Sequence, residues 1–140
     1  MFNVNLKSQF FLIKELLPLL LKGGKGRNIL TLTSYGAVDP FANIGVYNLT
    51  KAGQVAMVKF LAEELLDSAI RINALAPGLV PTDMSRGAFG EEAMKGFVEN
   101  FGHFVGSEED IASYAAVVCA EEGKFMNGEM VAVRMGTGKL

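Results

Sequence analysis

Hydrophobic residues follow two spacings along the chain, and these spacings predict alternating helices and strands. From Asn5 to Lys22 they recur every three or four positions, which is typical of a helix with one buried face. A second helical stripe runs from about Val46 to Leu66. Before and after it lie two short runs rich in strand-forming residues, Asn28–Thr33 and Ile70–Ala76.

The C-terminal part of the chain predicts one more helix and one more strand. Ser107 followed three residues later by Asp110 resembles a capping box, and the helix that it begins should run to about Ala120. Residues Glu129–Arg134 then predict a third strand. Because helices separate the strands, we expect parallel pairing with right-handed crossovers and therefore an α/β fold.

The segment between the second strand and the capping box interrupts this alternation. Residues 79–106 contain five glycines and one proline, so they predict an irregular flap over the sheet. One short helix is expected within it, near Glu91–Asn100.

Composition narrows the class of protein. The chain has 140 residues, half of them hydrophobic, which fits one globular domain. The net charge of −2 includes no basic block, so nucleic acid is not an expected partner. The apolar run at residues 10–21 contains Lys14 and Glu15 and is too short to span a membrane. A single cysteine, Cys119, and a single histidine, His103, give neither a disulfide nor a metal-binding cluster.

These features favour a cytoplasmic location, because a lone cysteine suits a reducing compartment. The final residues Gly138-Lys139-Leu140 are similar to the Ser-Lys-Leu peroxisomal signal, with glycine in place of serine. We favour an ordinary chain end and keep a peroxisomal location as the alternative.

A pair of side chains near the start of the second predicted helix carries candidate chemistry. Tyr47 and Lys51 lie four residues apart, so both project from one helix face. A nearby ammonium stabilises a phenolate, which makes tyrosine a usable general acid and base. Ser34, at the end of the preceding strand, is placed to hydrogen-bond and polarise a substrate carbonyl. The pair alone has an ordinary alternative, a surface tyrosine beside a solvated lysine.

Five stretches in order strengthen the chemical interpretation. They are VNLKSQF (residues 4–10), ILTLTS (29–34), YNLTKAG (47–53), RINALAPGLVPTDM (71–84) and NGEMVAV (127–133). Together they resemble the C-terminal part of the short-chain dehydrogenase/reductase family, and in particular its carbonyl-reducing members that use NADP(H). The resemblance implies a partial Rossmann-like, doubly wound parallel sheet of about three strands and an oxidoreductase that interconverts carbonyls and alcohols.

The resemblance also assigns roles to residues. Tyr47 matches the catalytic acid and base, Lys51 the lysine that tunes it and binds the nicotinamide ribose, and Ser34 the serine that positions the carbonyl. Asn5 matches an asparagine that supports a proton-relay water, although it could equally be an ordinary polar residue near a helix start. Asn73 matches a structural asparagine.

A further group of residues is implied in cofactor binding. They match a segment that contacts the nicotinamide carboxamide and a nearby phosphate: Pro77, Gly78, Val80 and Thr82. For Thr82, a cap on a following short helix is an equally weighted alternative.

The resemblance enters the family pattern at the helix that carries Asn5. The strand and glycine-rich turn that would bind the pyrophosphate are not in residues 1–140. The residue that would determine the preference for NAD or NADP belongs to the same N-terminal half and is not in these residues either. One edge of the strand Asn28–Thr33 should therefore be open, and the faces of the first two helices should seek a partner, most simply a second copy. The alternative to an oxidoreductase is thus a catalytically incompetent relative that serves as an oligomerisation or interaction module.

Overall fold

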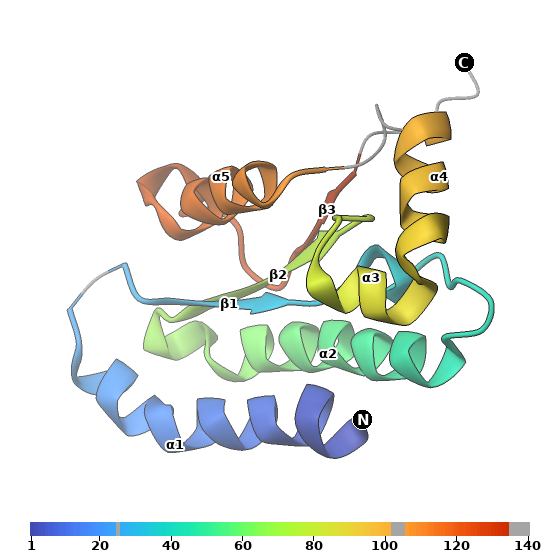
Figure 1. Cartoon of the computed structure of the whole chain (residues 1–140). Coiled ribbons are helices and arrows are strands. Elements are labelled where there is room, and N and C mark those ends of the chain that lie inside the picture. Colours follow the sequence, from blue (N-terminus) through green and yellow to red (C-terminus); the bar gives the residue numbers. More distant parts are fainter. Residues whose placement is uncertain (25, 102–105, 135–140) are drawn as a thin grey trace.

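Three short parallel strands form a sheet in the order β1-β2-β3. The strands are β1 (Asn28–Leu32), β2 (Arg71–Pro77) and β3 (Met130–Val133), and both pairings are parallel. This computed structural model describes residues 1–24, 26–101 and 106–134 (Figure 1). The predicted α/β class is confirmed, because the sheet is parallel throughout and helices flank it.

Helices cover both faces of the sheet, with α1 and α2 on one side and α5 on the other (Figure 1). A π-helix, η1, precedes α1, and a short 3-10 helix, η2, follows β1. The bounds are η1 (Asn3–Lys7), α1 (Ser8–Lys22), η2 (Tyr35–Ala37), α2 (Gly45–Glu64), η3 (Leu66–Ser68), α3 (Asp83–Phe89), α4 (Glu91–Phe101), α5 (Glu108–Cys119) and η5 (Glu121–Gly123). In the described ranges, no helix is both long enough and apolar enough to cross a bilayer.

The core lies where α2 packs on the central strand. Met57, Val58 and Ala62 of α2 are buried against Ile72 and Ala74 of β2. Residues 72–76 of β2 are all buried, because helices cover both faces of this strand and strands flank both edges. This packing holds α2 against the sheet.

A buried asparagine joins β2 to the chain that leads into β3. The side-chain amide of Asn73 donates to the Met126 carbonyl at 2.9 Å, and its oxygen accepts from the Glu129 amide at 3.0 Å. Asn73 is fully buried. The predicted structural role of Asn73 is therefore seen directly in its contacts.

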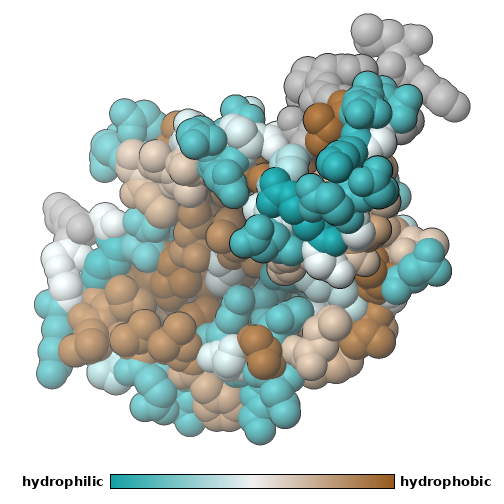
Figure 2. All heavy atoms as spheres, in the orientation of Figure 1, coloured by the Kyte–Doolittle hydropathy of each residue, from teal (hydrophilic) through white to brown (hydrophobic). Residues whose placement is uncertain are grey.

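The outer edge of β1 is open in the part of the chain that the structure describes. Within those ranges β1 pairs only with β2, and Leu32 at its end is 53% exposed. Figure 2 shows hydrophobic side chains gathered between α1 and α5, on the face where this edge lies. This matches the open edge expected from the sequence.

Residues 79–106 are more regular than the sequence analysis predicted. Two helices, α3 and α4, occupy most of the segment, whereas only one was expected. The expected helix is α4, and the additional helix is α3, which begins where Thr82 and Ser85 form a reciprocal capping box. Of the glycines in this segment that the structure describes, Gly87 and Gly96 lie within helices, and Gly90 and Gly106 lie between them. His103 lies outside the described residues, as do Gly138, Lys139 and Leu140.

Replacing Asn73 by leucine tests the link between β2 and β3. The variant keeps the number and branching of the side-chain heavy atoms, in a slightly bulkier side chain, but leaves the Met126 carbonyl and the Glu129 amide without their partner. We expect a loss of about 2–4 kcal/mol in the free energy of unfolding, measured by urea titration. Asn100→Ala, at an exposed helix end, is the matched control and should change stability by less than about 0.5 kcal/mol. Equal effects of the two changes would contradict the assigned role.

Candidate active site

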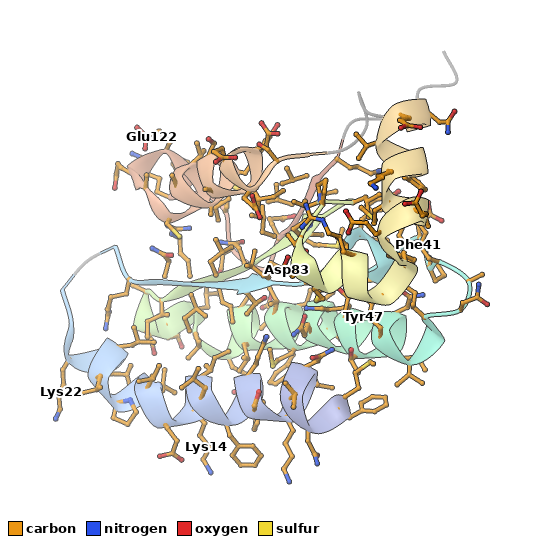
Figure 3. The ribbon with its side chains drawn as sticks, in the orientation of Figure 1. Lys14, Lys22, Phe41, Tyr47, Asp83 and Glu122 are labelled. Atoms are coloured by element: carbon orange, nitrogen blue, oxygen red, sulfur yellow. The ribbon has the colours of Figure 1, made fainter. Side chains whose placement is uncertain are left out.

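The candidate residues converge at the carboxyl end of the sheet. Ser34 follows β1, Pro77 ends β2, and α2 begins at the same end of the sheet (Figure 1). In Figure 3 the labelled Tyr47 and Asp83 mark the first turns of α2 and α3 at this end. Open parallel sheets place their ligands here, since the loops that leave the strands surround the same space.

Tyr47 and Lys51 project from the first turns of α2, and both are half-buried. The Lys51 Nζ lies 5.6 Å from the centre of the Tyr47 ring. It also donates to the Leu32 carbonyl at the end of β1, at 3.0 Å. Burial lowers the pKa of the Lys51 ammonium from its ordinary value of 10.5. The structure thus brings a cation beside the tyrosine and holds it there through the strand.

Ser34 begins the loop between β1 and α2, and its own side chain shapes that loop. The Ser34 Oγ accepts from the Gly36 amide at 3.2 Å and caps η2. Gly36 packs against Asn48 of α2, since a Cβ at position 36 would lie 2.6 Å from the Asn48 Oδ1. Asn48 itself donates to the Phe41 carbonyl at 2.8 Å. The Ser34 hydroxyl keeps its hydrogen to donate, because in this contact it acts as the acceptor.

Thr33 fastens this serine loop to the helix, and the sequence analysis did not single it out. Its Oγ1 donates to the Lys51 carbonyl at 2.9 Å, and its amide donates to the Leu75 carbonyl of β2 at 2.8 Å. Thr33 is buried, at 5% exposure. One residue therefore joins β1, β2 and the turn of α2 that carries Lys51. Its only signal in the sequence is a polar residue in a buried strand next to Ser34.

Asn5 is tied to the same helix from the opposite side. Its amide donates to the Thr50 Oγ1 at 3.0 Å, and the Thr50 hydroxyl donates to the Tyr47 carbonyl at 2.7 Å. The backbone carbonyl of Asn5 accepts from the side chain of Gln54, which is buried. Asn5 lies in η1, the π-helical turn that leads into α1. The structure thus brings Asn5 to the backbone of the Tyr47 turn, through Thr50.

Thr50 and Asn48 are buried, which also bears on a possible modification. They form an Asn48-Leu49-Thr50 glycosylation sequon, yet they are 0% and 5% exposed and both are hydrogen-bonded. The fold therefore uses these residues to build the site and leaves Asn48 inaccessible to a glycan.

The segment after β2 reaches the same end of the sheet. Pro77 pairs with Val133, and the Gly78 amide donates to the Val133 carbonyl at 3.0 Å. Val80 offers its carbonyl to the Ser85 hydroxyl at 2.8 Å. Thr82 caps α3, with its Oγ1 accepting from the Ser85 amide at 3.4 Å, so the capping alternative is observed. Its hydroxyl hydrogen stays available for a second partner.

The arrangement suits proton transfer to an oxygen atom. It combines a tyrosine hydroxyl, an adjacent ammonium and a serine hydroxyl, all at one end of the sheet. In the ranges that the structure describes, no group of three or more histidine, cysteine or carboxylate side chains could hold a metal ion.

Comparisons with known proteins agree with this architecture. A family model described as enoyl-(acyl carrier protein) reductase matches residues 1–137. Dehydrogenase/reductase SDR family member 4 of Sus scrofa is 35% identical over 137 residues, covering 96% of this chain and 49% of the relative. Dehydrogenase/reductase SDR family member 2, mitochondrial, of Homo sapiens is 35% identical over 133 residues. The match covers 94% of this chain and 47% of that relative.

A solved structure shows the same fold. The 3-ketoacyl-(acyl-carrier-protein) reductase of Brucella melitensis, crystallised with NADH, superposes with a TM-score of 0.84 at 29% identity. The superposition covers 95% of this chain and 55% of that protein. The chain therefore spans about half the length of the relatives that it matches.

The lowered pKa of Lys51 predicts how stability depends on pH. Below 10.5 the unfolded chain holds this proton more tightly than the folded chain does, so the free energy of unfolding rises as pH increases from the folded pKa towards 10.5. Lys51→Met removes this contribution. The stability of the wild type relative to this variant should therefore increase between about pH 7.5 and about pH 10.

Urea titrations at both pH values measure this difference. Lys59→Met, which removes an exposed lysine from the same helix, is the matched control for the loss of a positive charge from α2. A relative stability that falls as the pH rises would show that folding raises the pKa of Lys51.

Proposed function

The chain belongs to the short-chain dehydrogenase/reductase family, and we propose that it carries the catalytic half of an NAD(P)-dependent oxidoreductase acting on a carbonyl or alcohol. The observation that supports this most is the placement of Tyr47 and Lys51 on α2, held to the carboxyl end of β1 beside Ser34. The NADH in the Brucella melitensis reductase supports a nicotinamide cofactor. We propose NAD or NADP as that cofactor.

In the proposed reaction each side chain has a separate task. The Ser34 hydroxyl donates to the substrate carbonyl oxygen and holds it near Tyr47. The Tyr47 hydroxyl then donates its proton to that oxygen in reduction and becomes a phenolate, and in oxidation the Tyr47 phenolate accepts the proton of the alcohol. Lys51 favours the phenolate that remains, since its ammonium lies 5.6 Å from the ring centre. A bound nicotinamide would supply or accept the hydride.

Several groups fit a nicotinamide cofactor. The Lys51 ammonium has three hydrogens, and the Leu32 carbonyl takes one of them, so two can reach a ribose. The Thr82 hydroxyl retains a donor for the carboxamide or a phosphate. Pro77, Gly78 and Val80 bring backbone groups to the same end of the sheet. Asn5 would contribute indirectly, because through Thr50 it positions the turn that carries Tyr47, and it would also position a relay water.

A second candidate function is an oligomerisation or interaction module. It is favoured by an apolar groove between η1, α1 and α2, whose lining includes Leu6, Phe10, Phe11, Met57 and Phe60. Phe10 and Phe60 lie across the groove with ring centres 6.4 Å apart, and Phe60 is 48% exposed. Exposed aromatic rings of this kind suit a protein interface. We propose that a second copy of the chain covers this surface, whether or not the chain is active by itself.

The proposed location is the cytoplasm or, as the alternative, the peroxisome. Cys119 is a free and exposed thiol, which suits a reducing compartment.

Tyr47→Phe tests the oxidoreductase proposal. Removing the hydroxyl should lower kcat by about 10²–10⁴-fold while nicotinamide binding changes by less than about threefold. The measurements are carbonyl-dependent oxidation of NADPH and NADH, and titration of both dinucleotides. Tyr114→Phe, on the exposed side of α5, is the matched control and should leave both quantities unchanged. If the wild-type chain binds neither dinucleotide, catalysis by this chain is excluded and the interaction module is favoured.

Phe60→Glu tests the proposed interface. A carboxylate in the apolar groove must be desolvated when a second copy binds, so the variant should sediment as the 15.0 kDa monomer while the wild type sediments as a larger species. Phe125→Glu, at a ring that is 91% exposed outside the groove, should keep the wild-type mass. A monomeric wild type would contradict the interface.

A further inference from the structure

Arg134 crosses the carboxyl end of the sheet and stacks on a residue next to Ser34. Arg134 follows β3, and its guanidinium carbon lies 3.8 Å from the centre of the Tyr35 ring. Tyr35 follows Ser34 directly and begins η2. Because β2 lies between β1 and β3, the Arg134 side chain spans the edge of the sheet from one outer strand to the loop after the other.

Gly78 makes this path possible. A Cβ at position 78 would lie 3.0 Å from the Cβ of Arg134, which is closer than nearly all real contacts of this kind. The Gly78 amide also donates to the Val133 carbonyl at 3.0 Å, so the backbone before Arg134 is held next to the end of β2. The position of Arg134 is therefore set by the same segment that carries the proposed cofactor contacts.

Arg134 differs from the other three arginines in what it binds. Arg27 and Arg71 donate to backbone carbonyls and fasten structural elements, and Arg86 pairs with acidic side chains of α3 and α4. Within the described residues, Arg134 has the ring contact but neither a hydrogen bond nor an ion pair. Stacking occupies one face of a guanidinium and leaves the N–H groups at its edge free.

We propose that Arg134 recognises a carboxylate on the substrate, so that the preferred substrate is a small oxo acid or the matching hydroxy acid. A guanidinium edge binds a carboxylate through two parallel hydrogen bonds, and the Tyr35 ring holds that edge in one orientation. Since Ser34 and Tyr35 are adjacent, their Cα atoms lie only about 3.8 Å apart. Arg134 and Ser34 therefore both act at the start of the loop after β1, and we expect one substrate to present its carboxylate to Arg134 and its carbonyl to Ser34.

This inference rests on the proposed function, because it specifies the substrate class of the same site. It also has a test that does not need turnover. Levulinate, a small oxo acid, and its methyl ester differ in the negative charge that Arg134 would recognise and in one methyl group. Both can be titrated into the ¹³C,¹⁵N-labelled full chain while NMR follows the Arg134 Nε–H signal and the Tyr35 ring carbons and hydrogens.

The expected result is saturable binding of levulinate that shifts both signals, with binding of the ester at least about tenfold weaker. Arg134→Gln should weaken levulinate binding about ten- to hundredfold, whereas Arg134→Lys should keep part of it, since an ammonium supplies the charge without the planar fork. Arg86→Gln is the matched control and should bind as the wild type does. Spectra of each free variant report whether it is folded.

Three outcomes would overturn the inference. They are equal affinity for acid and ester, unchanged levulinate binding by a folded Arg134→Gln variant, and an Arg134 signal that responds to NADH or inorganic phosphate but not to levulinate. The last outcome would assign Arg134 to a cofactor phosphate. The NADH titration also separates the two proposals: failure to bind NADH or NADPH counts against the oxidoreductase function, whereas failure to distinguish acid from ester counts only against Arg134.

Discussion

The hydrogen bonds of Thr33 are the constraint on which the site depends. This single residue donates to a carbonyl of α2 through its side chain and to a carbonyl of β2 through its backbone. The helix turn that carries Lys51 is thereby held in one position relative to the carboxyl ends of β1 and β2. A displacement of that turn would move Lys51 away from the Leu32 carbonyl and would move Tyr47 relative to Ser34. The geometry of the proposed chemistry is therefore a consequence of how one buried hydroxyl is satisfied.

Polar side chains, and not apolar ones, set the orientation of α2 around this point. Asn5 and Thr50 hold the helix from the side of η1, and Asn48 holds the loop that carries Ser34. Apolar packing against β2 stabilises the helix but tolerates sliding, because dispersion contacts have little directional preference. Hydrogen bonds to specific carbonyls are directional, so they select one register of the helix on the sheet. The three buried polar residues of α2, which are Asn48, Thr50 and Gln54, each make a hydrogen bond to a backbone carbonyl.

The comparison with the relatives bears on two parts of the molecule, the open edge of β1 and the carboxyl end of the sheet. It spans about half of their length, and within the described ranges one edge of β1 has no neighbouring strand. The residues at the carboxyl end of the sheet are nevertheless arranged by contacts within the chain itself. The proposed proton transfer and substrate recognition thus rest on residues of this chain. The affinity for a dinucleotide depends on how much of the cofactor-binding surface these residues provide.

The sequence by itself determined the order and type of most elements, because these depend on local properties. Apolar spacing predicted α1, α2 and the three strands to within one or two residues at most ends, and the Ser107–Asp110 pair predicted the start of α5. The same local reasoning selected Tyr47 and Lys51, since a four-residue spacing on a helix fixes a shared face. It missed α3, whose start depends on a cap made by Thr82 and Ser85 among residues that otherwise resemble a loop.

Only the tertiary structure decided what each side chain contacts. Asn5 meets Thr50 across 45 positions of sequence, and Arg134 meets Tyr35 from the opposite edge of the sheet. No spacing or propensity encodes such pairs, because they form when parallel strands bring distant loops to one end of a sheet. The proposed chemistry was therefore predicted from local pattern, whereas the positioning of Tyr47 and the proposed preference for an anionic substrate depend on the assembled fold.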